Sequence, residues 1–304
     1  MTRSWIGRIW TCLGIWTCLE GACRRSQLLD KIRVRDPFLA LFLALTLLLW
    51  GDQPAIARGG AVQVDAELVF AVDVSYSMDQ AEQVLQRNGY AEALVSEQFL
   101  QALKGGLYGK IAIAYLQWAS YRDQDVILPW TLIDGPESAA AAAAKLRRAP
   151  YRRAQRTSVS GAIDSSMYLF ENNGYDGLRR IIDVSGDGPN NDGRPVEAAR
   201  DAAVAAGVTI NGLPLVGIRP LLGYADIAEL DLYYQDCVIG GDGAFMIAIH
   251  DRKAFVDATR TKLVQEIAAP LIRPQSSDIL PAQARPSKTN CMIGEILWNR
   301  RWRN

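Results

Sequence analysis

Short apolar runs alternate with stretches of helical periodicity through most of the chain. Apolar runs bounded by turn residues predict buried strands, and they lie at residues 67–72, 110–118, 126–133, 179–185, 208–216 and 244–249. Apolar positions at helical spacing predict helices at residues 79–104, 137–148, 158–170, 196–206, 225–235 and 253–272. This alternation is typical of an α/β three-layer sandwich, in which helices cover both faces of a mostly parallel six-stranded sheet. We expect one such domain at residues 62–273, with its sites in the loops at the carboxyl ends of the strands.

The N-terminal region has the pattern of a targeting segment. Three basic residues precede an apolar run at residues 38–50, and the small-x-small sequence Ala55-Ile56-Ala57 follows it. The run is shorter than the ~20 residues of a membrane-spanning helix and has the length of the apolar part of a signal peptide. We expect residues 1–57 to be a signal segment cleaved after Ala57, with an uncleaved anchor as the alternative. The stretch of ~35 residues before the apolar run is long for a signal peptide, and a misassigned start codon would explain it. The mature protein is then exported and is periplasmic or extracellular.

Charge and composition limit the possible functions and indicate the nature of the C-terminal region. The chain contains 33 basic and 33 acidic residues, a balance that disfavours a nucleic-acid-binding protein. Residues 274–304 hold prolines between polar residues, which predicts a flexible tail. Its basic and aromatic end, residues 298–304, is expected to be solvated, and contact with an anionic membrane or a partner is the alternative. Outside the signal segment only Cys237 and Cys291 remain, and the sequence leaves their pairing open.

Oxygen-bearing side chains follow the first predicted strand at alternate positions. Asp73, Ser75 and Ser77 lie in D-V-S-Y-S, between this strand and the next predicted helix. Carboxylate and hydroxyl oxygens at this spacing can converge on one point, and they are the hard ligands that Mg²⁺, Mn²⁺ or Ca²⁺ prefer. A helix N-cap at Ser77 or Asp79 would explain the same residues without a metal.

Two further loops add candidate residues. Thr157 opens a predicted helix in R-T-S-V-S-G-A-I, where it is either a ligand or an N-cap. Asp187 lies in S-G-D-G-P-N-N-D-G after the fourth predicted strand, where it is either a ligand or part of a polar turn. Asp183 has the same strand parity as Asp187 and could replace it as the ligand. Otherwise Asp183 and Asp192 are expected to support the ligands without touching the metal.

Together the three loops resemble the metal-ion-dependent adhesion site of von Willebrand A-type domains, which have a Rossmann-like fold. The resemblance covers about residues 65–272, and stretches such as I-D-V-S-G-D-G-P-N-N and Y-Y-Q-D-C-V-I-G-G are similar to an uncharacterised bacterial family of exported von Willebrand A-like proteins. It implies that a divalent cation, Mg²⁺ or else Mn²⁺ or Ca²⁺, is bound by Asp73, Ser75, Ser77, Thr157 and Asp187. It also implies a protein-binding module that captures an Asp or Glu carboxylate of a partner through this cation. The third loop departs from the usual Thr/Ser-Asp-Gly, since it reads S-G-D-G here.

Two other functions are weighed against metal-dependent binding. A metal-independent scaffold would use the same fold without a cation. A metal-dependent hydrolase is less favoured, because the sequence has no G-x-S-x-G, P-loop or G-x-G-x-x-G motif, and because Ser75 stands where a phosphatase-like site would want an aspartate. The only histidine, His250, is expected to be structural. The sequence therefore predicts a protein that is not an enzyme.

Overall fold

The computed structural model describes residues 60–216, 227–268, 279–281 and 289–301. They belong to one compact unit that begins at Gly60. The expected signal segment, residues 1–57, lies outside the described residues. In the described part of the chain, no helix is both long and apolar enough to cross a membrane.

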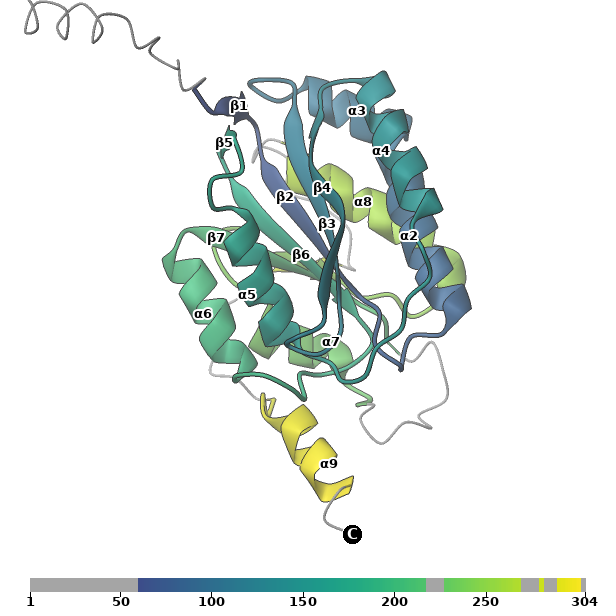
Figure 1. Cartoon of the computed structure of the whole chain (residues 1–304), viewed down its shortest axis with the longest axis vertical. Coiled ribbons are helices and arrows are strands. Elements are labelled where there is room, and N and C mark those ends of the chain that lie inside the picture. The colour runs from purple at the N-terminus through teal and green to yellow at the C-terminus, as the bar shows by residue number, and fades with distance from the viewer. Residues whose placement is uncertain (1–59, 217–226, 269–278, 282–288, 302–304) are drawn as a thin grey trace, which may run out of the picture. The chain divides into compact units, whose positions relative to one another are not determined.

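A seven-stranded sheet lies at the centre of this unit, in the order β4-β3-β2-β6-β7-β8-β9 (Figure 1). Its strands are β2 (Glu67–Asp73), β3 (Ile111–Trp118), β4 (Gln124–Ile133), β6 (Arg180–Gly186), β7 (Val208–Pro214), β8 (Phe245–Ile247) and β9 (Ile279–Pro281). The neighbours from β3 to β8 pair in parallel, whereas β4 and β9 join the two edges antiparallel. Six of these strands match the six that the sequence predicts, and β9 is an additional edge strand. A separate parallel pair consists of β1 (Val62–Val64) and β5 (Tyr175–Gly177).

Helices cover both faces of the sheet (Figure 1). One face packs against α2 (Gln80–Leu94), α3 (Glu97–Lys104), α4 (Pro136–Arg148) and α8 (Phe255–Ile267). The other packs against α5 (Val159–Leu169), α6 (Val196–Ala205), α7 (Leu230–Tyr233) and the π-helix η1 (Tyr234–Val238). Strand residues are buried on both faces, which explains why these strands are continuous apolar runs in the sequence. The predicted three-layer α/β sandwich is confirmed.

Three helices differ from the prediction. The stretch at 79–104 forms α2 and α3 rather than one helix, because the Ser96 hydroxyl accepts a hydrogen bond from the Phe99 N–H at 3.2 Å and begins a new helix. The helix predicted at 225–235 is the single-turn α7, which continues as η1, and residues 225–226 lie outside the described residues. The last predicted helix begins with a 3-10 turn, η2 (Arg252–Ala254), and its predicted end at 269–272 lies outside the described part.

The C-terminal region contains a helix that its composition did not predict. α9 (Ile293–Arg301) lies within the expected flexible tail. A disulfide joins Cys291, just before α9, to Cys237 in η1, with their Cα atoms 5.5 Å apart. The last proline of this region, Pro286, precedes α9, so nothing in the helix itself interrupts backbone hydrogen bonding. The cysteine pairing that the sequence left open is therefore present, and residues 293–301 differ from the expected tail.

The strand order brings the three candidate loops to one edge of the sheet. β2 and β6 are parallel neighbours, with Val72 opposite Ser185, so the loops that follow them leave the sheet at the same edge. The Ser158 N–H, at the start of α5, donates to the Ala119 carbonyl after β3 at 2.7 Å. The loops meet at the carboxyl edge of the sheet, as the fold class predicts.

Candidate metal site

Asp73 ends β2 and lies at the bottom of the candidate site. Its side chain is fully buried, and its Oδ1 accepts a hydrogen bond from the Ser75 N–H at 2.7 Å. This local bond folds the chain into a tight turn as it leaves the sheet. The other oxygen, Asp73 Oδ2, is buried and has no hydrogen-bond partner among the described residues. One carboxylate oxygen therefore shapes the loop, and the other stays available.

The two serines connect Asp73 to the loop after β6. Ser75 Oγ and Ser77 Oγ lie 2.7 Å apart, within hydrogen-bond distance. Ser77 Oγ donates to Asp187 Oδ1 at 2.5 Å. Three of the five predicted ligands, Ser75, Ser77 and Asp187, thus form one hydrogen-bonded group of side-chain oxygens, and Asp73 joins it through the Ser75 N–H. The N-cap explanation of the first loop applies to Asp79 and not to Ser77. Asp79 is the N-cap of α2, and its side chain accepts a hydrogen bond from the Glu82 N–H.

Thr157 is joined to the same loop through the backbone. Its N–H donates to Asn191 Oδ1 at 3.0 Å, and its carbonyl accepts from the Asn191 N–H at 2.8 Å. A Cβ at Gly188 would lie 4.0 Å from Thr157 Oγ1, so the Thr157 side chain lies beside the residue that follows Asp187. Ser158, and not Thr157, is the N-cap of α5. The structure therefore places Thr157 beside the other candidate ligands.

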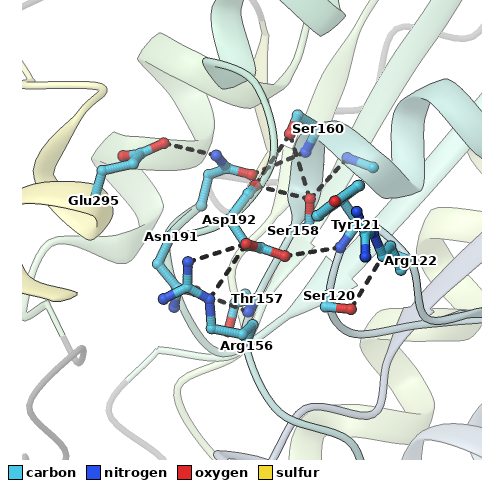
Figure 2. Close-up of polar contacts among 12 residues, drawn as sticks. Ser120, Tyr121, Arg122, Arg156, Thr157, Ser158, Ser160, Asn191, Asp192 and Glu295 are labelled. Carbon is cyan, nitrogen blue, oxygen red and sulfur yellow. Dashed lines mark hydrogen bonds and ion pairs between the residues drawn. The ribbon is translucent and has the colours of Figure 1, made fainter. Parts of the chain in front are cut away.

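Asp192 holds the second and third loops together (Figure 2). One of its carboxylate oxygens accepts from Arg156 Nη2 at 3.0 Å, and the other accepts from the Tyr121 N–H at 3.0 Å. Its carbonyl accepts from the Ser158 hydroxyl at 2.8 Å. Arg156 and Ser158 are the residues before and after Thr157, so Asp192 positions the loop that carries Thr157 through its bonds to them.

The structure does not bring Asp183 to these loops. Its carboxylate is buried and accepts from Tyr90 Oη at 3.1 Å and from Lys262 Nζ, which places it on the sheet face that α2 and α8 cover. Lys262 also donates to Glu266. Burial, followed by the negative charge of Asp183, raises the pKa of Glu266 to about 7. Asp183 thus belongs to a buried charge network in the core.

The chemistry of the candidate site fits a hard divalent cation. Burial raises the pKa of Asp73 well above its usual range, and the nearby charge of Asp187 raises it further, because two carboxylates repel in a dry environment. A Cβ at Gly186 would lie 3.0 Å from Asp73 Oδ2 and 3.0 Å from Tyr234 Oη, so a side chain at this position would crowd the carboxylate. Among the described residues no three His, Cys, Asp or Glu side chains form a metal-binding group. A cation here would depend on hydroxyl oxygens as well as on the two carboxylates.

Sequence reasoning missed several residues that support the site. Asn190 Oδ1 accepts from the Ser160 N–H at 3.0 Å, and its side-chain amide donates to Glu295 of α9 at 2.7 Å. The Tyr233 hydroxyl accepts from the Asn190 N–H at 3.0 Å. The sequence N-N-D after Gly188-Pro189 signals a turn and nothing more. The supporting role of Asn190 depends on loops that come together only in the folded chain.

The sequence family described as "Protein of unknown function (DUF1194)" matches residues 63–271, more than half of the chain. The chain belongs to this family. Every candidate ligand lies within the DUF1194 region. Comparison with curated protein sequences gives no match.

Several solved structures are similar to this DUF1194 chain. The von Willebrand factor type A protein from Catenulispora acidiphila is 14% identical, with a TM-score of 0.49, covering 67% of this chain and 43% of that one. The pilus adhesin SpaC from Lactobacillus rhamnosus GG is 11% identical, with a TM-score of 0.49, covering 69% of this chain and 31% of that one. Proximal thread matrix protein 1 from the mussel byssus, in a structure with a zinc-occupied MIDAS motif, is 13% identical, with a TM-score of 0.46, covering 67% and 46%.

The chain thus spans less than half the length of each of these three proteins. The mostly parallel α/β sandwich that the sequence predicts is present in this DUF1194 chain. Strand order and loop positions agree with it: Asp73 follows β2, Thr157 precedes α5, and Asp187 follows β6.

Proposed function

We propose that this DUF1194 protein is a divalent-metal-dependent, adhesion-type protein-binding module. The observation that carries the proposal is the hydrogen-bonded group Ser75, Ser77 and Asp187 beside the buried Asp73 carboxylate. Asp73 Oδ2 has no hydrogen-bond partner among the described residues. A buried carboxylate oxygen without a partner costs free energy, and a cation at this point would offset that cost.

Five residues would hold the ion, which we propose to be Mg²⁺, or else Mn²⁺ or Ca²⁺: Asp73, Ser75, Ser77, Thr157 and Asp187. Three of these groups are neutral hydroxyls, and hard cations take about six or more oxygen ligands. When bound, the ion supplies positive charge and an open coordination position. The chain orients its oxygens toward that position, and an Asp or Glu carboxylate of a protein partner completes the coordination. Binding of this kind breaks no covalent bond.

The partner would be met outside the cytoplasm. This part of the proposal rests on the sequence, because the apolar run at 38–50 and Ala55-Ile56-Ala57 have the pattern of a cleaved signal segment. An exported protein would meet its partners in the periplasm or outside the cell.

Calorimetric titration of Mg²⁺ into the protein tests the metal site. We expect Asp73→Ala to abolish Mg²⁺ binding while far-ultraviolet circular dichroism stays unchanged, because the substitution removes a ligand at the sheet edge. We expect Asp187→Asn to weaken Mg²⁺ binding much more than Asp183→Asn, because only Asp187 bonds to Ser77. Asp183→Asn is the matched control for losing one buried or half-buried carboxylate.

The results of these titrations distinguish the metal-dependent module from a metal-independent scaffold, and an enzyme assay distinguishes it from a hydrolase. Unchanged Mg²⁺ affinity in Asp73→Ala would reject the adhesion site and favour a metal-independent scaffold. If Asp183→Asn is the damaging change, the third ligand is misassigned. Turnover in a panel of hydrolase substrates that requires both Mg²⁺ and Asp73 would favour the hydrolase instead.

A further inference from the structure

Arginine side chains lie over aromatic rings around the candidate metal site. The Arg153 guanidinium lies 5.0 Å from the centre of the Tyr76 ring, and that of Arg122 lies 5.0 Å from the centre of the Tyr121 ring. These distances are typical of cation–π contacts, to which arginine and tyrosine are well suited. Each pair stands beside a candidate loop, so the pairs form part of the surface next to the site.

The two tyrosines are attached directly to the proposed ligand loops. Tyr76 is the residue between Ser75 and Ser77, and it is 53% exposed. The Tyr121 N–H bonds to Asp192, as Figure 2 shows, and its side chain is 47% exposed. Large aromatic side chains of this exposure contribute little to the core, and tyrosine and arginine are enriched where proteins bind partners.

The charges beside the two tyrosines are not balanced. Arg152 pairs with Asp123, and Arg156 pairs with Asp192. In the described residues, by contrast, neither Arg122 nor Arg153 forms an ion pair with a carboxylate. Arg153 donates to the Tyr76 carbonyl, which holds it above the first loop. Two exposed positive charges thus lie next to a site that we propose to hold a cation.

From this arrangement we infer that the face around the metal site binds an acidic segment of a partner protein, in which the metal-binding carboxylate is flanked by further Asp or Glu residues. Arg122 and Arg153 contact the flanking carboxylates, and the rings of Tyr76 and Tyr121 pack against the segment. This inference rests on the proposed function for its central contact. It adds the flanking charges, which select the partner and speed its association.

Fluorescence anisotropy with three labelled peptides tests the inference. The first peptide has a central Asp flanked by Glu, the second has the same Asp flanked by Gln, and the third has a central Asn flanked by Glu. In Mg²⁺ we expect the full-length protein to bind the first roughly tenfold more tightly than the second, as two exposed ion pairs would give. The Arg122→Gln, Arg153→Gln double variant should lose most of this preference and keep its Mg²⁺ affinity by calorimetry.

A second double variant, Lys104→Gln with Lys110→Gln, is the control, because it removes the same charge at the amino end of β3, the opposite edge of the sheet. It should retain the preference for the Glu-flanked peptide. Equal binding of the first two peptides, an unchanged preference in the arginine variant, or no binding of any peptide to protein that binds Mg²⁺ overturns the inference. Equal binding of the Asp and Asn peptides would instead contradict the proposed function, because the flanking charges would act without a metal-bound carboxylate.

Discussion

Gly186 lies directly beside the buried carboxylate of Asp73. A Cβ there would lie 3.0 Å from Asp73 Oδ2 and 3.2 Å from Asp73 Cβ, tighter than ordinary contacts allow. We predict that Gly186→Ala lowers Mg²⁺ affinity by about tenfold or more, a loss typical of changes that displace a ligand without removing it. Calorimetric titration measures this effect.

Gly188→Ala is the matched control in the same loop. Its Cβ would lie 3.9 Å from Thr157 Cγ2, an ordinary contact, so Mg²⁺ affinity should stay near that of the parent protein. Parental affinity in Gly186→Ala would show that Asp73 Oδ2 does not need the space, and would argue against its role as a ligand.

The titration of Glu266 in the buried charge network makes the stability of the fold depend on pH. Its pKa is raised from 4.5 to about 7 by burial and by Asp183. A carboxyl group whose pKa is higher in the folded state than in the unfolded state contributes stability at pH values below its unfolded-state pKa. This contribution is lost as pH rises through its folded-state pKa. At about 1.4 kcal/mol per pKa unit, the loss is roughly 3 kcal/mol.

We therefore predict that Glu266→Gln removes this dependence. Urea unfolding at about pH 5 and about pH 8 should show the free energy of unfolding of the parent falling relative to that of the variant at the higher pH. The exposed Glu92→Gln is the control for loss of one carboxylate. A constant difference between parent and Glu266→Gln across this range would contradict the prediction.

The first loop is the part of the site that residue patterns predict best. The alternate oxygens of Asp73, Ser75 and Ser77 lie within one tight turn, so spacing alone brings them together. The choice between Asp183 and Asp187 could not be made from strand parity, because β6 ends at Gly186 and the turn redirects Asp187 toward Ser77. Asp183 lies on the sheet face that α2 and α8 cover, and its partners on these helices come together only in the folded chain.

At the scale of elements, α9 is fixed against the site from two directions. The disulfide Cys237–Cys291 anchors its start to η1, and Asn190 of the third loop donates to Glu295 in its first turn. A Cβ at Gly294 would lie 1.9 Å from the Asn190 carbonyl oxygen. The helix therefore packs on backbone that continues directly from Asp187 and Gly188.

We predict that loss of this disulfide destabilises the chain and releases α9. Replacing Cys237 and Cys291 with alanine should lower the free energy of unfolding by about 2–4 kcal/mol, as for other loops of this size. Limited proteolysis should then cut between residues 289 and 301 under conditions that leave the parent intact. Two free thiols in the non-reduced parent protein would disprove the pairing.

Gly294→Ala provides an independent test of the docked helix, with both cysteines retained. The added Cβ meets backbone rather than a flexible side chain, so α9 must shift. We expect faster proteolysis of α9 in this variant while the disulfide stays intact. Cleavage as slow as in the parent would mean that α9 does not pack on Asn190.

The elements that the sequence predicts least well depend either on a local cap or on contacts far away in the chain. Ser96 divides α2 from α3 although the apolar spacing continues through it, and a local N-cap decides that boundary. α9 forms where composition predicts a tail, because Cys291 and Gly294 are fixed by partners far away in the chain. Continuous apolar strands such as β2 and β3 are predicted well, since burial on both faces leaves a clear signal.

At the scale of the whole molecule, the order of elements follows from the sequence, whereas their neighbours in the sheet do not. Alternating strands and helices predict parallel pairing, yet β4 returns antiparallel beside β3. The segment from β3 to β4, Ala119 to Asp123, is too short for a crossover helix, so only a hairpin connection is available. The same short connection carries Tyr121 and Arg122, and places them beside the candidate site.

The N-terminal segment has the pattern of a part that is removed on export. The compact unit begins at Gly60, and its first strand, β1, pairs with β5, so a chain starting at Arg58 keeps every contact of that unit. We predict that N-terminal sequencing of the exported protein gives Arg58 as the first residue. A chain of residues 58–304 made without the segment should unfold at the temperature of the exported protein, and Mg²⁺ should raise that temperature in both, since a ligand of the folded state stabilises it. An exported protein that still carries the apolar run at 38–50 would contradict cleavage and favour an anchor, and a 58–304 chain that fails to fold would mean that the segment contributes to the domain itself.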